Sequence, residues 1–308
     1  MEIYLPIAEQ SMNVFVLLGL GAAAGLLAGM FGVGGGFLAT PLLIFVGIPP
    51  AVAVASQANQ VIANSISSLQ VQWRRGNVDL RMGLILLLGG MVGSTAGVSL
   101  FTYLKRIGQI DFVIAVLYVL MLSTIGLLML FESLRTYLKR RRNPEGPRGK
   151  LHTHYLVHRL PLKLRFYKSK LYISALLPVG IGFAIGVLSA ILGVGGGFVL
   201  VPAMIYILGM PTAVVIGTSN FQILFVAANV TFLQAATNGT VDVVLALLLI
   251  LGGVIGAPVG SRLAAKLPGV ALRGLMAILI LLVASELLTE LLRTPGSLYS
   301  LSPREVVP

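Results

Sequence analysis

The chain has 308 residues, of which 57% are hydrophobic and 10% are charged, and its formal net charge is +12. A soluble domain carries about 25% charged residues, so this composition excludes an ordinary soluble protein and indicates a chain whose solvent is lipid. The chain has no cysteine, which excludes disulfides, a thiolate nucleophile and a cysteine-based metal site.

Long apolar stretches predict α-helices that cross a bilayer. A helix needs about 20 residues to span a hydrocarbon core of about 30 Å. Eight stretches are near that length, at 12–31, 51–71, 82–101, 112–131, 172–192, 213–236, 243–261 and 270–292. Two further apolar stretches, 37–47 and 198–209, are too short to span alone. The predicted fold class is therefore an all-α polytopic membrane protein.

One glycine-rich hexapeptide occurs twice and divides the chain into two homologous halves. Gly-Val-Gly-Gly-Gly-Phe runs over 32–37 and again over 193–198, followed by Pro41 and Pro202. The similarity continues beyond the glycines and aligns Val54–Asn59 with Val215–Asn220 and, after a two-residue insertion, Gly76–Asp79 with Gly239–Asp242. Three parts are predicted: a first transmembrane repeat over 1–131, a basic linker over 132–171 and a second transmembrane repeat over 172–308.

The net charge is concentrated in the linker. Between Arg135 and Lys170 lie 12 of the 22 lysines and arginines, against one acid, Glu145. Nucleic-acid or phosphoinositide binding is one interpretation of such a segment. Because the rest of the chain is apolar, a cytoplasmic loop that follows the positive-inside bias is the interpretation we prefer, and no nucleic-acid partner is predicted.

Equivalent turns in the two halves carry different charges. The turn 73–81 holds three arginines, whereas its counterpart 234–242 holds no lysine or arginine. An inverted repeat requires this difference, because equivalent turns then face opposite sides of the membrane. Each half would contain one re-entrant helical hairpin with the glycines at its tip, over 12–47 or 172–209, and three transmembrane helices. Eight plain spans with parallel halves are the alternative, and Lys105-Arg106 does not fit the inverted scheme, which places it outside.

The glycine tips suit an anion. Consecutive glycines permit positive φ values and a tight backbone reversal. The reversal leaves amide groups without intrahelical partners at the start of the next helix, and these amides and the helix dipole attract negative charge. Two tips from opposite faces would meet near the bilayer midplane. The predicted substrate-binding tip residues are Gly34, Gly35, Gly36, Gly195, Gly196 and Gly197.

Neutral polar side chains follow each tip inside an apolar stretch. Amides in a bilayer commonly join helices, but their recurrence in both halves favours a lined substrate site. The residues assigned to this site are Gln57, Asn59, Gln60, Thr218, Ser219, Asn220 and Gln222. Helix packing is the interpretation for three other polar residues, Asn64, Ser65 and Asn229, and for the glycines Gly89, Gly93, Gly97, Gly252, Gly256 and Gly260.

The acidic residues and the histidines are assigned no role in catalysis or metal binding. Asp79 and Asp242 precede apolar stretches and are predicted to be helix N-caps. Glu286 is the one acid for which we consider proton coupling. The histidines, His152, His154 and His158, all lie in the linker at spacings that fit neither a metal site nor a triad. The sequence therefore predicts no enzyme, no catalytic residues, no metal site and no cofactor.

At these motifs the chain resembles the TauE/SafE family of sulfite exporter-like membrane proteins. The resemblance covers residues 12–292 and is carried by Gly29–Phe37 with Pro41, Ser189–Phe198 with Pro202, and Gly217–Ser219. The first half departs from the last of these patterns, since it reads Ser56-Gln-Ala. The resemblance implies export of sulfite or small organosulfonates across a bacterial inner (plasma) membrane.

These observations predict a secondary transporter that exports a small anion by alternating access. The anion would bind near the midplane, held by half-helix N-termini and neutral amide and hydroxyl groups. An anion channel and a membrane-embedded protein without transport activity are the alternatives. The partners expected are the anion and the bilayer. The sequence fixes neither the coupling ion nor the oligomeric state, for which a homodimer is one option.

Overall fold

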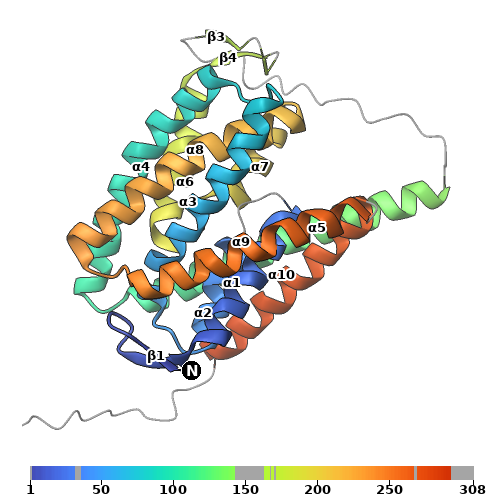
Figure 1. The fold of residues 1–308 in the computed structure, drawn as a ribbon. Coiled ribbons are helices and arrows are strands. Elements are labelled where there is room, and N and C mark those ends of the chain that lie inside the picture. The colour runs from blue at the N-terminus through green and yellow to red at the C-terminus, as the bar shows by residue number, and fades with distance from the viewer. Residues whose placement is uncertain are drawn as a thin grey trace, which may run out of the picture.

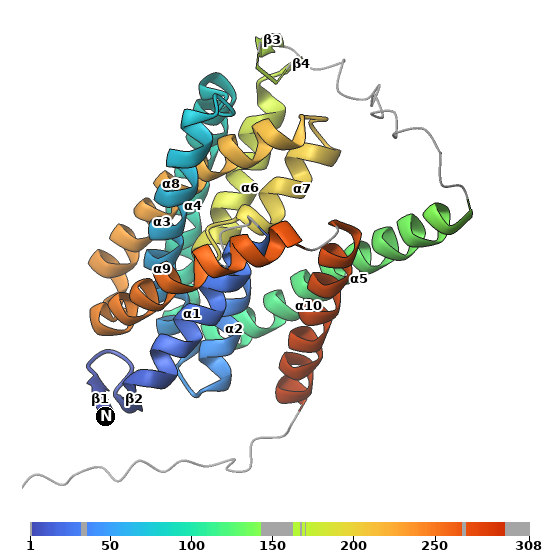
Figure 2. The same cartoon turned by 45° about the vertical axis from the view of Figure 1, so that its right-hand side comes forward.

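The computed structural model describes residues 2–31, 36–142, 163–166, 168–169, 171–266 and 269–292. Within these ranges the chain forms helices and two short antiparallel β-ribbons (Figures 1 and 2). The first half contains β1 (Glu2–Leu5), β2 (Gln10–Asn13), α1 (Val14–Phe31), α2 (Gly36–Phe45), α3 (Pro50–Arg74), α4 (Leu80–Arg106) and α5 (Ile110–Arg142). The second half contains β3 (Lys163–Phe166), β4 (Leu171–Ser174), α6 (Leu176–Leu192), α7 (Gly197–Tyr206), α8 (Thr212–Leu233) with the π-helical turn η2 (Gln234–Asn238), α9 (Val243–Lys266) and α10 (Gly269–Leu292).

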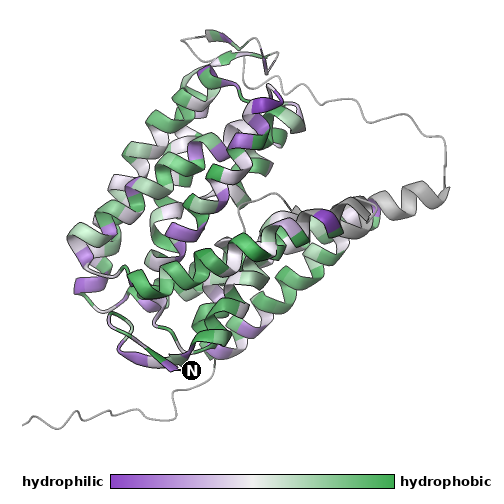
Figure 3. Ribbon diagram, in the orientation of Figure 1, coloured by the Kyte–Doolittle hydropathy of each residue, from purple (hydrophilic) through white to green (hydrophobic). Residues whose placement is uncertain are grey.

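The helices confirm a membrane protein fold. Five of the helices in the described residues are long and apolar enough to cross a bilayer: Leu80–Arg106, Ile110–Arg135, Ala213–Asn238, Val243–Gly260 and Gly274–Leu292. Large apolar side chains such as Leu88, Phe131 and Ile255 are about two-thirds exposed, and hydrophobic residues predominate along the helices (Figure 3). Lipid tails are the solvent that such a surface requires.

The two halves have the same order of elements, a ribbon followed by a short helical pair and three longer helices. Their helices interlock, because α1 packs along α9 of the other half and α6 packs along α4. Small residues permit this close approach: a Cβ atom at Gly93 would overlap the carbonyl oxygen of Phe183, and one at Gly256 would overlap that of Ala22. The packing interpretation of these glycines is confirmed.

Both predicted N-caps are confirmed, and each also anchors a ribbon. Asp79 Oδ1 accepts from the amide of Met82 at 3.2 Å, and its Oδ2 accepts from the amide and hydroxyl of Ser169, in the β3–β4 turn, at 3.1 and 2.6 Å. Asp242 accepts in the same way from the amides of Leu245 at 3.1 Å and of Ile7, in the β1–β2 turn, at 3.0 Å. Each ribbon therefore holds a helix of the opposite half, and the two ribbons lie at opposite ends of the molecule (Figure 1).

Equivalent hydrogen bonds fix the alignment of the two halves. The amide of Asp242 donates to Ser56 Oγ and the amide of Asp79 donates to Thr218 Oγ1, both at 3.0 Å, so Ser56 corresponds to Thr218. The predicted alignment of Val54–Asn59 with Val215–Asn220 is therefore wrong by one residue. One extra residue lies between Pro202 and Gly209, relative to the first half, and hydropathy alone cannot place it.

Each short helical pair is a hairpin that begins and ends at its own ribbon. Gln10 Nε2, in β2, donates to the carbonyl oxygen of Gly47, after α2, at 3.0 Å. In the second half Phe166 and Ile173 of the ribbon share one apolar cluster with Leu208 and Met210, which follow α7. The second tip, residues 193–197, is buried inside the molecule.

The predicted linker overlaps regular structure at both of its ends. Helix α5 continues to Arg142, and β3 begins at Lys163. The predicted boundaries 132–171 stay a prediction, and the three histidines lie outside the described residues.

Candidate functional site

The start of α2, directly after the first glycine tip, meets the second tip. The rings of Phe37 and Phe198, the equivalent residues that end the two hexapeptides, stack with centroids 4.2 Å apart and an interplanar angle of 8°. A Cβ atom at Gly36 would lie 3.2 Å from the carbonyl oxygen of Val194. Gly34 and Gly35 lie outside the described residues, whereas Gly36 and the whole second tip, 193–197, are buried.

The second tip has the predicted left-handed backbone. The φ angles of Gly193, Gly195 and Gly196 are 67°, 69° and 74°, a region that glycine adopts without strain. Among the described residues the amides of Gly195 and Gly196 make no hydrogen bond. Both residues are buried among apolar side chains, since a Cβ atom at Gly195 would meet Val61 and one at Gly196 would meet Ile185.

Three glutamines surround the point where α3 and α8 cross beside the tips. Gln60 Nε2 donates to the carbonyl oxygens of Gly21 at 3.1 Å and Leu249 at 3.0 Å, and its Oε1 accepts from Gln57 Nε2 at 2.8 Å. Gln60 thus joins α3 to α1 and α9. In the part of the chain that the structure describes, Gln57 Oε1 and both amide atoms of Gln222 are buried without a hydrogen-bond partner.

The other predicted site residues are partly occupied by local bonds. Asn59 Nδ2 donates to the carbonyl oxygen of Ser56 at 3.3 Å, and Ser219 Oγ and Asn220 Nδ2 donate to that of Ile216 at 3.2 and 2.7 Å. Thr218 accepts from Asp79 and so supports the start of α4. Asn59 and Asn220 are not equivalent, because in the observed alignment Asn220 corresponds to Ala58.

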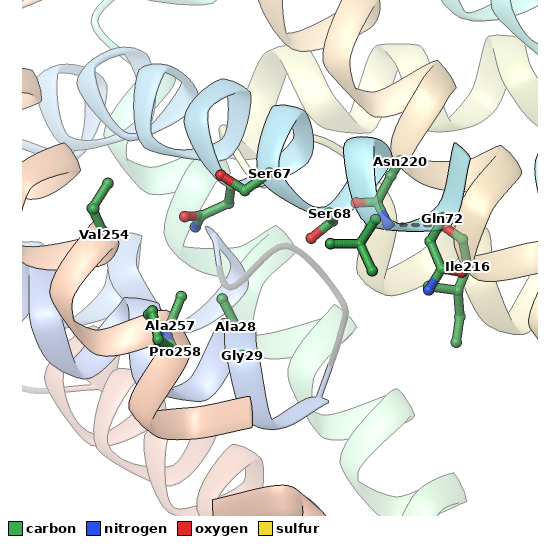
Figure 4. Close-up of a pocket in the computed structure, with 12 residues that line it drawn as sticks. Ala28, Gly29, Ser67, Ser68, Gln72, Ile216, Asn220, Val254, Ala257 and Pro258 are labelled. Carbon is green, nitrogen blue, oxygen red and sulfur yellow. Dashed lines mark hydrogen bonds between the residues drawn. The ribbon is translucent and has the colours of Figure 1, made fainter. Parts of the chain in front are cut away.

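A cavity of about 470 Å³ lies between α3 and α8 on one side and α1 and α9 on the other (Figure 4). Of the predicted site residues described, only Asn220 lines it. The wall consists of Ala28, Gly29, Asn64, Ser67, Ser68, Val71, Gln72, Ile216, Asn220, Val254, Ala257 and Pro258. Sequence reasoning missed Ser67, Ser68 and Gln72 and assigned Asn64 to packing, although spacings of three and four residues place these side chains on one face of a helix.

The cavity occupies the half of the molecule that contains the β3–β4 ribbon. Helix α3 ends at Arg74 beside this ribbon. Lys168 in the β3–β4 turn donates to the carbonyl oxygens of Gly76 and Val78, just after α3, at 3.3 and 3.1 Å. Arg74 and Arg75 are exposed just beyond the lining residue Gln72. At its inner side the cavity reaches Gly29, in the last turn of α1 before the first tip.

The chemistry of the wall is that of neutral donors. Amides and hydroxyls of Asn64, Ser67, Ser68, Gln72 and Asn220 interrupt an apolar lining that contains no lysine, arginine, aspartate or glutamate. Such a surface hydrogen-bonds an anion without binding it as tightly as a full charge does, a property that passage requires. Within the described residues no group of histidine, aspartate and glutamate side chains forms a metal site, and Glu286 lies exposed on α10, away from the cavity wall.

Comparison with known proteins gives one consistent result. Residues 17–287 match the protein family described as "Sulfite exporter TauE/SafE". The chain is 30% identical over 256 residues to a "Probable membrane transporter protein" of Xylella fastidiosa (strain 9a5c), covering 82% of this chain and 86% of that protein. It is 29% identical to the "Probable membrane transporter protein YjnA" of Bacillus subtilis (strain 168), covering 90% of this chain and 100% of that protein. No solved structure matches the chain significantly.

Proposed function

The chain belongs to the TauE/SafE family, whose members are membrane transporters and not enzymes, and we propose that it exports a small anion, sulfite or a small organosulfonate, by alternating access. One observation carries this proposal. A cavity walled by neutral hydrogen-bond donors leads from the arginine-bearing end of α3 to the last turn before a glycine tip.

The anion would bind at the tips, near the crossing of α3 and α8. The amides of Gly195 and Gly196, which make no hydrogen bond among the described residues, the side-chain amide of Gln222 and that of Asn220 on the cavity wall would supply the donors. A buried amide without a partner costs about 1–3 kcal/mol, so a ligand that accepts from Gln222 recovers a penalty that the empty site carries. The predicted glycines of the first tip would contribute in the same way.

We propose that the two halves are inverted repeats in the membrane. Helix α3 would be a sixth span, because its 25 residues extend about 37 Å at 1.5 Å per residue even though its polar side chains lower its hydropathy. The two hairpins would be re-entrant from opposite faces. The positive-inside bias then places Arg74, Arg75 and the cavity mouth in the cytoplasm, so the observed conformation would load an exported substrate. Lys105 remains the exception, since it donates to Asn238 at the opposite end.

Export of a monoanion needs no proton. An interior-negative potential favours its exit by about 2.3 kcal/mol per 100 mV. Alternating access would then rock one group of helices against the other around the tips.

Purified protein in liposomes tests the proposal. With an imposed potential and no pH gradient, we expect saturable sulfite flux that follows the potential. Flux that does not saturate, or single-channel currents, would identify an anion channel instead. Absence of flux for sulfite, sulfoacetate and taurine would support a membrane protein without transport activity.

A further inference from the structure

We propose that Asn229 of α8, with Ser94 and Thr95 of α4, forms the latch of a second gate, which opens when the described cavity closes. This inference rests on the proposed transport function. It names residues that touch neither the cavity nor the tips, and it follows from comparing each cavity residue with its counterpart in the other half.

The counterpart of the cavity is closed by apolar packing. In the observed alignment the polar lining residues Asn64, Ser68 and Asn220 correspond to Val226, Val230 and Ala58. These three counterparts, together with Ala190, form one buried apolar cluster. The lining residue Gly29 corresponds to Ala190, so the seal contains the counterparts of both walls of the cavity.

Two hydrogen bonds close the sealed side across the helices. Asn229 Nδ2 donates to Ser94 Oγ at 2.8 Å and to Thr95 Oγ1 at 3.3 Å. On the open side the corresponding positions are occupied by Ser67, Ala257 and Pro258, all of which line the cavity. Alanine and proline side chains have no hydrogen-bonding atom, so this latch cannot form there.

The sequence therefore favours the conformation with the cavity side open over the one in which the two halves exchange roles and the sealed side is open. Each hydrogen bond contributes about 0.5–1.5 kcal/mol net, which corresponds to roughly a two- to tenfold bias toward the conformation in which it forms. The bonds must break during a transport cycle, and a bias of this size permits that while keeping the cavity side open at rest.

Thiol labelling gives a direct test because the chain has no cysteine of its own. Val230→Cys reports the sealed side and Ser67→Cys reports the cavity, each tested in full-length protein in liposomes with a membrane-impermeant methanethiosulfonate added from one side at a time. In the otherwise unchanged chain we expect Ser67→Cys to react from the arginine-bearing side, and Val230→Cys to react slowly from the opposite side.

Each of two latch variants replaces one latch residue by the residue at the equivalent position of the other half. Asn229→Ser and Ser94→Ala should raise the labelling rate of Val230→Cys from the opposite side by about two- to tenfold and lower that of Ser67→Cys. Ser285→Ala is the matched control, because among the described residues the Ser285 hydroxyl donates only to the carbonyl oxygen of Leu282 on its own helix, and its loss should change neither rate. Protection of Val230→Cys that is unchanged in both latch variants would overturn the inference and make the cluster a static seal.

A reverse variant covers the case in which the latch variants fold poorly. Ser67→Asn combined with Ala257→Ser and Pro258→Thr should build a latch on the cavity side and slow the labelling of Ser68→Cys. Unchanged labelling of Ser68→Cys in a folded protein would count against gating at these positions. The flux and labelling experiments test different claims. No anion flux in liposomes with the wild-type protein would contradict the proposed function. Normal flux with labelling rates that do not change in the latch variants would contradict only the latch.

Discussion

Gln60 and Gln222 occupy equivalent places in the two halves, and their surroundings differ. Each lies against a glycine of the packed helix, Gly253 or Gly90, at the crossing of α3 and α8. Gln60 donates to two carbonyl oxygens and accepts from Gln57, whereas both amide atoms of Gln222 are buried without a partner among the described residues. The repeat thus preserves the positions of these two glutamines and not their hydrogen bonds. One half-site is closed on itself, and the proposed function assigns the other to the anion.

The largest effect is expected from breaking the tip that lies between these half-sites. Gly196→Ala places a Cβ against Ile185 and forces alanine into a left-handed conformation, which alone costs about 1–2 kcal/mol. We expect sulfite flux in liposomes to fall by at least about tenfold and the melting temperature to drop. Gly180→Ala is the control. Gly180 lies in α6, where an added Cβ would have no atom within 4 Å, so this variant should keep both its flux and its melting temperature. Equal flux in the two variants would show that transport does not need the left-handed backbone of the tip at Gly196.

A matched pair of substitutions tests the two glutamines directly. Gln60→Leu removes the bonds to Gly21 and Leu249 and leaves Gln57 unpaired, so we expect a loss of about 1–3 kcal/mol in unfolding free energy. Gln222→Leu removes an unpartnered amide of similar size, so stability should be equal or higher, while transport falls. Thermal unfolding in detergent and flux in liposomes measure the two effects. A Gln222 variant that is as unstable as the Gln60 variant, with normal flux, would contradict the assignment of Gln222 to the substrate.

Asn220 lines the cavity and Asn59 does not, so substitutions at these two residues test whether the cavity wall binds the substrate. A hydrogen bond to a charged group is worth about 1.5–3 kcal/mol, so Asn220→Ala should raise KM for sulfite by roughly tenfold or more with a smaller effect on the maximal rate. Asn59→Ala should change KM little, because Asn59 does not line the cavity. Initial rates over a range of sulfite concentrations separate the two variants. Equal KM values would return both asparagines to the symmetric role that the sequence predicted.

The sequence predicts much of this fold because its strongest signals are local. Runs of apolar residues predict helices, Asp79 and Asp242 predict the starts of α4 and α9, and consecutive glycines predict the left-handed turn at Gly196. The β-ribbons were not predicted, since strands of four residues are too short to show a period, and β2 and β4 run into the apolar stretches 12–31 and 172–192.

The cavity was missed for a different physical reason. Ser67 and Ser68 carry the same chemistry whether they join helices or line a space, and only the distance between four packed helices decides which. Two of the predicted site residues, Gln60 and Thr218, proved to be engaged by backbone groups. The offset between the halves was also misjudged by one residue, and that error paired Asn59 with Asn220.

The smallest effect concerns the two ends of the molecule. Arg74 and Arg75 are exposed beyond the cavity, and exposed positive charges raise the local concentration of an anion at a mouth. Arg74→Gln with Arg75→Gln should lower the initial rate at subsaturating sulfite by about two- to threefold in low salt, and the difference should vanish near 0.5 M salt, where screening acts over less than about 5 Å. Lys105→Gln, at the opposite end, is the control and should leave loading from the arginine-bearing side unchanged. A reduction that persists at high salt would mean that the arginines shape the mouth rather than attract the anion, and a reduction in the Lys105 variant alone would reverse the orientation proposed for the cavity.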